Sequence, residues 1–369
     1  MGRFPVGLPE TVVLMERDAL RQRQGRIWRS SQIRLVLFFA LTWLGVAGLL
    51  AFLLEEGRQQ AERKAEADAQ GVSGLLEARL AGTIQRLQAT LEHIATILPP
   101  EAFQPAAVPS RGAMVRRELI LYSRHFPEVA SFRVLDAAGN LLCASSAQGD
   151  ETNFREQDYW RVFAEGRGND LYFSAVEVDR SSARSILNVA VPARLDNGGL
   201  KGVVVARLDL TYLGQWFDSV AVGVQGVVSF RRIEDGSLIL RRPNLPERVN
   251  QPLLNHPLQQ QVESGVRSGT LRMRATLDGV ERIYGFRRLG DYPLYVIAGL
   301  AADDVLAGWR HSCMLAVVAG LLLFLALSLA LIRVLRAGSR EAVTARRLQD
   351  SEARYRMLAE NSHDVIWTI

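Results

Sequence analysis

The sequence predicts an α+β protein in which two transmembrane helices enclose two small sheet-forming modules. Residues 35–54 and 313–332 form two uncharged apolar runs of 20 residues each. A helix of that length crosses the hydrocarbon core of a bilayer, which is ~30 Å thick. Between the runs, helical spacing of apolar residues gives way to strand-like segments, and one order of elements occurs twice. The 369 residues have room for two or three domains.

The first apolar run, residues 35–54, is predicted to be an uncleaved membrane anchor. The alternative is a secretory signal peptide, but the run is longer than the apolar part of such a peptide. No small-x-small cleavage site precedes the Glu55-Glu56 pair. The second run, residues 313–332, is the second predicted membrane helix.

The charges beside the two runs predict the orientation in the membrane. Residues 1–34 carry 7 basic and 3 acidic side chains, and residues 333–369 carry 7 and 5, against 30 and 31 in residues 55–311. Cytoplasmic flanks of membrane helices retain positive charge. We therefore expect a multi-pass protein of the inner membrane with both termini in the cytoplasm and residues 55–312 in the periplasm. The net charge of +5 thus reflects orientation and is no argument for nucleic-acid binding.

A long helix is predicted over residues 55–98, continuous with the first membrane span. Its apolar positions recur every three or four residues, which indicates one apolar face, and Pro99 and Pro100 end it. This face is an apolar stripe; its members are Val72, Leu76, Leu80, Ile84, Leu87, Leu91, Ile94 and Leu98. The stripe packs either against the chain's own sheets or in the interface of a homodimer. A second helix is expected near residues 114–125.

The membrane-distal module is predicted over residues 114–218. Turn sequences at Asp136–Gly139 and at Asn197-Gly198-Gly199 separate segments rich in strand-forming residues. The order is strand, strand, helix, strand, strand, strand. The strands are predicted at residues 128–135, 140–145, 171–178, 185–194 and 201–210, with the helix around Tyr159, Trp160 and Phe163.

The membrane-proximal module, residues 219–300, repeats this order. Its strands are predicted at residues 226–233, 237–240, 269–277, 280–288 and 292–299, with a helix at 256–264. Sequence identity between the two modules is negligible, so the repeat is one of architecture.

Three phrases in the outer segment resemble a known family. They are FREQDYWRVF from Phe154, GGLKGVVVARLDLTYL from Gly198 and TLDGVERIYGFRRLGDYPLYVIAGL from Thr276. Together with two membrane spans, a long helix and tandem α/β modules, they resemble the double Cache sensor domain. The resemblance implies PAS-like modules with a central antiparallel sheet, and a transmembrane receptor that binds a small ligand in the periplasm.

The end of the chain resembles a different domain. Residues 333–350 are predicted to form a cytoplasmic signalling helix. The sequence SEARYRMLAENSHDVIWTI at residues 351–369 resembles the opening of a cytoplasmic PAS domain, with a leading helix and a first strand at 364–369. Such a domain needs on the order of 100 residues. The resemblance therefore implies a longer receptor, whose output is a histidine kinase or a diguanylate cyclase.

No catalytic or metal-binding pattern stands out in the sequence. The five histidines are scattered, without a pair at the spacing of zinc ligands. No phosphate-binding loop and no nucleophile elbow is present. We therefore expect no catalytic residue, no metal and no cofactor in this chain.

Seven residues of the membrane-distal module are predicted to bind a ligand, because charged and aromatic groups converge in pockets for small polar molecules. They are Arg155, Asp158, Tyr159, Trp160, Tyr172, Arg184 and Asp209. Amino-acid-binding double Cache domains use an Arg and aromatic residues for the carboxylate and an Asp for the amine. Here the aromatic pair is inverted and Arg155 is farther from it, so a carboxylate fits the pattern better than an amine.

Five of these residues also have a structural interpretation. Tyr159 and Trp160 have the character of core residues that pack a helix on a sheet. Arg155 and Arg184 suit a solvated or ion-paired surface. Asp209 suits a cap, either of its own strand or of the helix that follows it.

Two other classes of function compete with a ligand-gated receptor. The first is a chemoreceptor-like or partner-protein-binding membrane protein with no enzymatic output. The second is a membrane-tethered enzyme, which the missing catalytic constellation disfavours.

Overall fold

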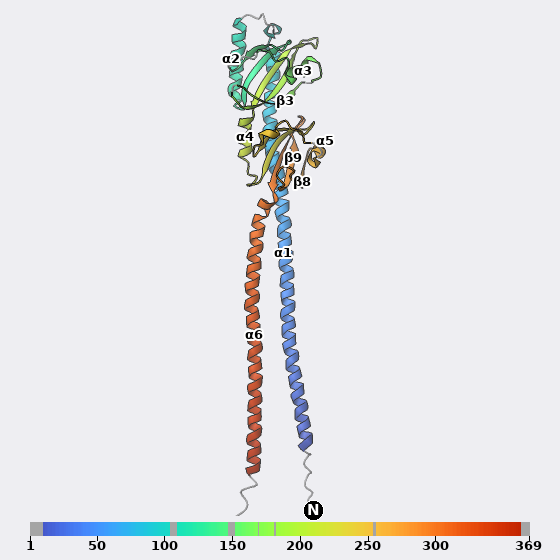
Figure 1. Cartoon of the computed structure of the whole chain (residues 1–369), viewed down its shortest axis with the longest axis vertical. Coiled ribbons are helices and arrows are strands. Elements are labelled where there is room, and N and C mark those ends of the chain that lie inside the picture. Colours follow the sequence, from blue (N-terminus) through green and yellow to red (C-terminus); the bar gives the residue numbers. More distant parts are fainter. Residues whose placement is uncertain are drawn as a thin grey trace, which may run out of the picture. The chain divides into compact units, whose positions relative to one another are not determined.

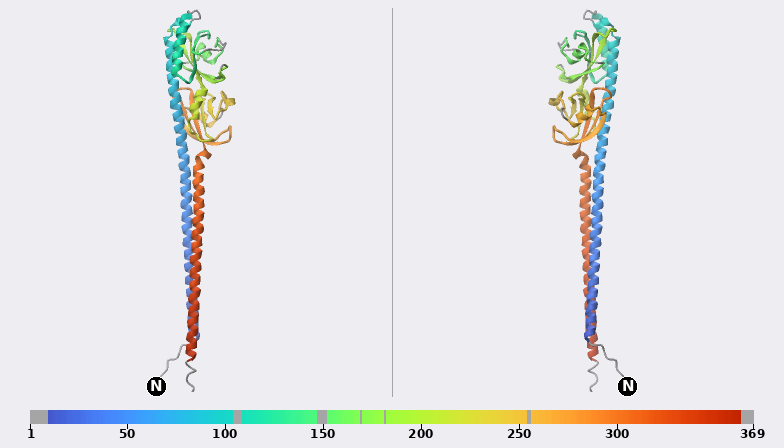
Figure 2. Two further views of the ribbon diagram at one scale, coloured as in Figure 1. Left: turned by 90° about the vertical axis from the view of Figure 1, so that its left-hand side faces the viewer. Right: turned by 90° about the vertical axis from the view of Figure 1, so that its right-hand side faces the viewer.

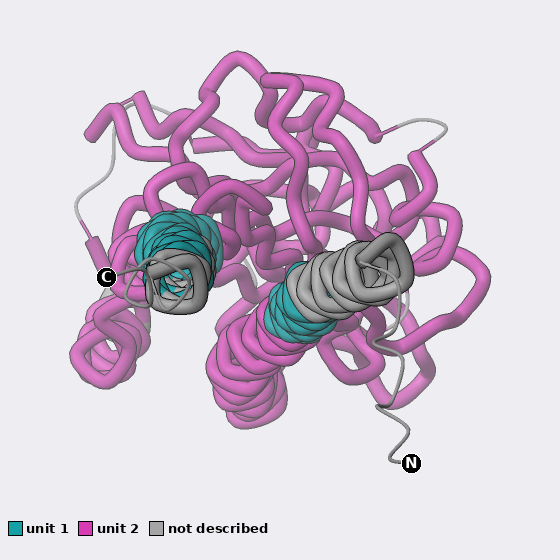
Figure 3. Tube along the Cα trace, turned by 90° about the horizontal axis from the view of Figure 1, so that it is seen from below, with its two compact units in different colours: residues 1–59, 308–369 teal, residues 60–307 magenta. Residues whose placement is uncertain are grey.

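The computed structural model describes residues 10–103, 109–146, 152–168, 170–180, 182–253 and 256–362. The chain divides into two compact units, which Figure 3 colours separately. Residues 1–59 and 308–369 form the membrane-helix unit, and residues 60–307 form the sheet unit.

The membrane-helix unit consists of parts of two long helices, α1 (Glu10–Ile97) and α6 (Ala302–Ser362). Among the described residues, two helical stretches, Ile33–Ile97 and Ala302–Ala337, are long and apolar enough to cross a membrane. The two helices touch within this unit. The rings of Trp43 and Phe324 meet edge to face at 5.0 Å, and Trp309 Nε1 donates a hydrogen bond to the Leu54 carbonyl at 2.8 Å.

Both helices extend beyond the predicted membrane spans. Helix α1 begins at Glu10, so the described part of the predicted N-terminal tail is helical. Helix α6 continues to Ser362 and includes the predicted signalling helix at residues 333–350. The strand predicted at residues 364–369 lies outside the described residues.

The first module of the sheet unit contains an antiparallel sheet in the order β2-β1-β5-β4-β3 (Figure 1). Its strands are β1 (Val129–Asp136), β2 (Leu141–Ala144), β3 (Tyr172–Val178), β4 (Ser185–Arg194) and β5 (Leu200–Asp209). Its helices are η1 (Pro100–Phe103), α2 (Pro109–His125), α3 (Asp158–Ala164) and α4 (Leu210–Asp218).

The second module repeats this sheet in the equivalent order β7-β6-β10-β9-β8. Its strands are β6 (Val227–Arg232), β7 (Leu238–Arg242), β8 (Ser268–Arg274), β9 (Glu281–Arg288) and β10 (Leu294–Ala301). Its helices are η2 (Pro246–Arg248) and α5 (Pro257–Glu263). The predicted order of strands and helices is confirmed in both modules. Helix α4 starts where the last strand of the first module ends, and it is the longest helix outside the predicted order of elements.

Helix α1 runs along one side of both sheets (Figure 2). We call the predicted apolar stripe of this helix, from Val72 to Leu98, the α1 stripe. One core cluster joins it to residues of both sheets, including Phe132 of β1 and Phe230 of β6. The opposite faces are covered by short helices, since α3 packs on the first sheet and α5 on the second. Because both faces are buried, the central strands are apolar on both sides, and β5 is buried at eight successive positions.

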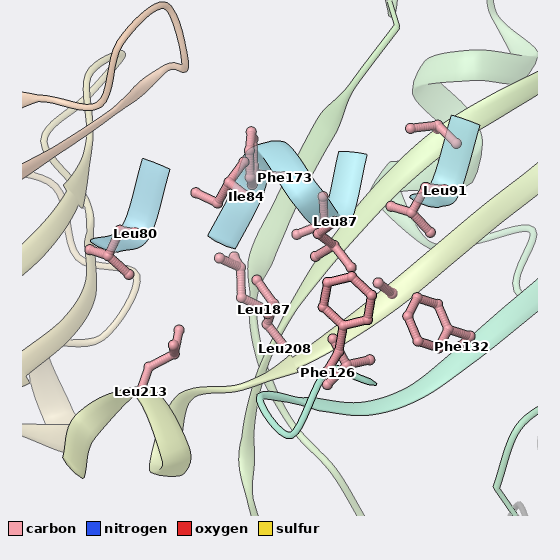
Figure 4. Close-up of a cluster of buried hydrophobic side chains, with 14 of the residues drawn as sticks. Leu80, Ile84, Leu87, Leu91, Phe126, Phe132, Phe173, Leu187, Leu208 and Leu213 are labelled. Atoms are coloured by element: carbon pink, nitrogen blue, oxygen red, sulfur yellow. The ribbon is translucent and has the colours of Figure 1, made fainter. Parts of the chain in front are cut away.

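The α1 stripe therefore belongs to the core of the chain. All its members are buried except Val72, which is partly buried. Figure 4 shows the stripe residues facing bulky side chains of the first module. The labelled residues are Leu80, Ile84, Leu87, Leu91, Phe126, Phe132, Phe173, Leu187, Leu208 and Leu213. Of the two interpretations of the stripe, packing against the chain's own sheets is the one observed, and the stripe is not available to a second chain.

A glycine brings the second sheet close to α1. A Cβ atom on Gly285 of β9 would lie 2.4 Å from the carbonyl oxygen of Ala69. Real Cβ atoms do not approach a backbone so closely. The contact between β9 and α1 therefore requires a residue without a side chain.

Two side chains of the second module bind the backbone of β3. The pairing of β3 with β4 shifts register between Phe173 and Val176, which disrupts the ladder there. Asn250 accepts a hydrogen bond from Val176 N at 2.9 Å and donates one to Val176 O at 2.7 Å. Arg232 donates to the carbonyls of Phe173, at 2.9 Å, and Ser174. The irregular part of β3 is thus completed by the second module.

Truncation of the stripe should distinguish core packing from chain association. We expect Leu87→Ala to destabilise the chain by about 2–5 kcal/mol because it opens a cavity in a close-packed core. The control is Leu75→Ala on the same helix, whose side chain is 64% exposed, with an expected effect within about 0.5 kcal/mol. Thermal unfolding of the detergent-solubilised chain at several protein concentrations measures both. A loss that varied with protein concentration would place Leu87 between two chains and contradict the core assignment.

Candidate functional site

Helix α3 holds an aromatic cluster against the first sheet. Tyr159, Trp160 and Phe163 are buried and pack on small apolar residues of β4 and β5. The Tyr172 ring on β3 meets the Phe163 ring edge to face at 6.5 Å. Three of the seven predicted residues therefore lie together: Tyr159 and Trp160 on the buried face of α3, and Tyr172 on β3 beside it.

The turn between β1 and β2 fixes the entry to α3. Gly139 in this turn has a φ of +85°, and a Cβ atom there would lie 2.9 Å from the backbone of Arg155. Only glycine both adopts this positive φ readily and lets the Arg155 backbone come so close. Trp160 Nε1 also donates to the carbonyl of Asp136 at 3.4 Å. The start of α3 is thus held on the hairpin.

Polar side chains lie on the same face of the first sheet, beneath α3. Arg207 of β5 stands opposite Ser131 of β1 on one side and Asn188 of β4 on the other. Arg133 follows Ser131 two positions along β1, on the same face. We call these four residues the α3-side polar cluster. All are buried: Asn188 is 0%, Arg207 7% and Arg133 8% exposed.

Several atoms of this cluster have no hydrogen-bond partner among the described residues. They are Ser131 Oγ, Arg133 Nε, Asn188 Nδ2, Asn188 Oδ1 and Arg207 Nε. Buried polar atoms in proteins are nearly always paired, so five such atoms on three adjacent strands mark a place where polar partners are needed.

The two arginines of the cluster differ in their ion pairing. Arg207 pairs with Asp179 at 2.7 Å and lies 3.7 Å from Glu177. Arg133 has no ion pair with a described residue, and its guanidinium carbon lies 4.6 Å from the centre of the Phe154 ring. Burial, and next the charge of Arg207, lowers the pKa of Arg133. Burial also raises the pKa of Tyr159, so its hydroxyl stays protonated. An anionic ligand would relieve the repulsion between the two arginines.

The remaining predicted residues lie outside this cluster. Arg155 is exposed, with its guanidinium carbon 6.0 Å from the centre of the Trp160 ring. Asp158 is exposed in the first turn of α3. Neither contacts the cluster through an interaction that would orient it.

Arg184 and Asp209 pair with each other, with Arg184 Nη1 2.8 Å from Asp209 Oδ2. The other carboxylate oxygen of Asp209 accepts hydrogen bonds from Thr211 N at 2.8 Å and Tyr212 N at 3.4 Å, which caps α4. Both oxygens of Asp209 are thus engaged, and the structural interpretation of this residue as a helix cap is the one observed.

The patterns that predict the ligand-binding residues do not single out the α3-side polar cluster. Its signal is a polar residue inside an otherwise apolar strand, as in SFRVL around Arg133, ILNVAV around Asn188 and VVARLDL around Arg207. A charged residue within a central strand is rarely buried without a partner. This signal is therefore visible in the sequence once the strands are known to be covered on both faces.

Two surface hollows lie away from the cluster. One, of about 550 Å³, lies between the end of α1 and the β4–β5 turn and includes Lys201. The other, of about 620 Å³, lies along α1 where the Arg79 guanidinium carbon is 4.0 Å from the centre of the Trp216 ring. Neither includes a predicted ligand-binding residue. Within the described ranges, no group of three His, Cys, Asp or Glu residues could hold a metal ion.

This architecture of tandem modules on one helix is shared with a known family. The family dCache_1, described as Cache domain, matches residues 54–309, and the chain belongs to that family. Apolar helices flank the matched domain, which takes up most of the chain. A comparison with functionally curated proteins finds no significant match.

Solved structures share the fold. The extracellular domain of rpHK1S-Z16, described as a histidine kinase, is 22% identical with a TM-score of 0.56, over 68% of this chain and 98% of that one. The periplasmic sensory domain of the Campylobacter jejuni chemoreceptor Tlp1 is 12% identical with a TM-score of 0.54, over 67% and 98%. The ligand-binding domain of the Pseudomonas aeruginosa PAO1 amino acid chemoreceptor PctB, in complex with L-Gln, is 16% identical with a TM-score of 0.50, over 69% and 98%.

Substitution of Asp209 should separate capping from other roles. We expect Asp209→Ala to destabilise the chain by about 1 kcal/mol because α4 loses its cap. Asp209→Asn should cost less, since the amide oxygen can still accept the hydrogen bonds from Thr211 and Tyr212. Chemical denaturation of the solubilised chain measures both variants. Equal losses in the two would show that the ion pair with Arg184, and not the cap, carries the stability.

Proposed function

We propose that the protein is a transmembrane signal receptor whose membrane-distal module, residues 114–218, binds a small carboxylate-bearing ligand between α3 and the first sheet. The observation that carries this proposal is the set of five unpartnered buried atoms in the α3-side polar cluster. An unpaired buried polar group costs about 1–3 kcal/mol. A ligand that pairs these atoms would recover that cost.

The chemistry of the cluster narrows the ligand class. The guanidinium of Arg133 and the hydroxyl of Tyr159 suit a carboxylate, and Arg207 adds a second cation. Asn188 offers both a donor and an acceptor, so the ligand also needs a donor such as a hydroxyl or an amine. If the ligand carries an amine, its acidic partners would be Glu177 and Asp179, which lie beside Arg207. We infer a small hydroxy acid or amino acid.

The predicted residues keep roles around this ligand. In the proposal, Tyr159, Trp160 and Tyr172 form the apolar wall, and the exposed Arg155 and Asp158 lie at its rim. Arg184 and Asp209 hold the end of the sheet against α4 and do not touch the ligand. The PctB structure contains L-Gln, which supports the capacity of this fold for an amino acid.

Signalling would pass through the second module into α6. Strand β10 ends at Ala301 and α6 begins at Ala302, so no residue intervenes between the second sheet and the apolar helix. A ligand that binds one arrangement of the modules better shifts the population toward it. We propose that this shift reaches a PAS domain beginning at residues 351–369 and a histidine kinase or diguanylate cyclase beyond it. A homodimer in the lipid bilayer of the inner membrane is part of the proposal.

A second function fits the same fold. The similarity to the sensory domains of Tlp1 and PctB favours a chemoreceptor-like protein with no enzymatic output. This alternative uses the same ligand site. A receptor that binds only a partner protein would instead leave the polar cluster without a small ligand.

The ligand proposal can be tested by thermal unfolding of the full chain in nanodiscs against a panel of hydroxy acids and amino acids. At a hundred times the dissociation constant, we expect the melting temperature to rise by about 5–10 °C for at least one compound. Arg133→Lys and Asn188→Ala should abolish the rise, because they remove the planar fork and the amide. The control is Arg267→Gln, whose side chain is 77% exposed. A panel without any stabilising member would refute the proposal.

The proposed orientation can be tested with topology reporters. We expect alkaline phosphatase to be active when fused after residue 108 and inactive when fused after residue 369, while green fluorescent protein should fluoresce only after residue 369. The physical reason is the arginine excess in the flanks of both apolar runs. The reverse pattern of activities would place the Cache domain in the cytoplasm.

A further inference from the structure

The second module repeats part of the polar cluster of the first. Strands β1 and β6 occupy equivalent places in the two sheets, and both carry the triplet Ser-Phe-Arg. The triplets are Ser131-Phe132-Arg133 and Ser229-Phe230-Arg231. In each, the phenylalanine is buried in the core cluster that contains the α1 stripe. The serine and arginine therefore lie on the opposite face, which α5 covers in the second module.

Three buried arginines gather on this α5 side of the second sheet. Arg231 of β6 is 7% exposed, Arg241 of β7 is 9% and Arg282 of β9 is 4%. Ser229 stands opposite Arg241. We call Ser229 and the three arginines the α5-side arginine cluster.

Of these three guanidiniums, only that of Arg282 forms an ion pair with a described carboxylate. All three nitrogens of the Arg282 guanidinium donate hydrogen bonds. Two go to the oxygens of Asp278, at 2.9 and 2.7 Å, and one goes to Gln225 O at 2.8 Å. Arg231 donates to Gly236 O at 2.6 Å, and its Nε has no partner among the described residues. The Arg241 guanidinium forms no hydrogen bond and no ion pair with a described residue, although the charges of Asp278 and Glu247 act on it. Two buried positive charges are thus left without a paired anion.

The surroundings increase the need for an anion. Burial, together with the charge of Arg241, lowers the pKa of Arg231. Burial also lowers the pKa of Arg241, where the charge of Asp278 acts in the opposite direction and that of Arg282 adds to the decrease. The charge of Arg231, after burial itself, also lowers the pKa of His256, whose Nδ1 is buried without a partner. Tyr295 is already engaged, because its hydroxyl donates to Gln259 Oε1 at 2.6 Å. Buried charges in proteins are paired or neutralised, and an unpaired one costs several kcal/mol.

We propose that the α5-side arginine cluster is a second binding site, for a small dianion such as phosphate, sulfate or a short dicarboxylate. Arg231 and Arg241 bind the anion, Ser229 donates to it, and the Arg282–Asp278 pair positions the neighbouring strand. The cluster contains no amide equivalent to Asn188, and the Asp278 carboxylate is already paired with Arg282. A doubly charged anion therefore fits it better than an amino acid. This site is separate from the ligand site under α3 and does not depend on it.

The test uses the full chain in nanodiscs, with sodium phosphate and sodium sulfate as probes and sodium chloride at equal ionic strength as the reference. We expect phosphate or sulfate to raise the melting temperature by about 5–10 °C at saturation and equilibrium dialysis to find one anion per chain. Arg241→Gln should abolish both effects. Because it removes an unpaired buried charge, it should not lower the melting temperature in chloride.

Three further variants separate the possible outcomes. Arg133→Gln, in the first module, and the exposed Arg267→Gln should keep the full response to the anion. Arg241→Lys keeps the charge without the planar fork and should bind about tenfold more weakly. An anion response that Arg241→Gln leaves intact and Arg133→Gln removes would assign the anion to the first module and overturn the proposal. No specific response in the unaltered chain would overturn it as well, whatever the hydroxy-acid panel shows.

Discussion

The structure depends on a single apolar stripe that two sheets share. The α1 stripe runs from Val72 to Leu98 on one helix, and neither sheet can bury its own apolar face without it. This arrangement assigns one face of each sheet to the helix. Most buried polar side chains of the central strands then lie on the opposite face, under α3 or α5. The positions of Arg133 and Arg231 follow from this constraint.

Burial of arginine on those faces lowers the stability of the fold, and core packing does not require arginine there. The four residues beneath α3 and the arginines beneath α5 all stand where apolar side chains would stabilise the sheets more. Partial compensation comes from Asp179 in the first module and Asp278 in the second. The unpaired remainder is the physical basis for both proposed sites, because stability given up in a core can be regained when a ligand binds.

The two modules are mechanically connected at the irregular part of β3. Ser174 there accepts a hydrogen bond from Asn188 N at 3.0 Å, while its carbonyl accepts one from Arg232 of the second module. Asn250 binds the backbone of Val176 beside it. Hydrogen bonds therefore connect the α3-side polar cluster to the second sheet through β3. From the second sheet, β10 continues directly into α6.

The sequence by itself determined the membrane helices, the α1 stripe and the repeated order of strands, because each depends on local periodicity and on turn residues. It also placed Tyr159, Trp160 and Tyr172 near one another through a family resemblance. Only the tertiary structure decided that the stripe is internal, that Asp209 caps α4, and that Arg133, Asn188 and Arg207 meet under α3. Those facts depend on strand register and on which face of each sheet the helix covers, and both are set by contacts between segments far apart in the chain.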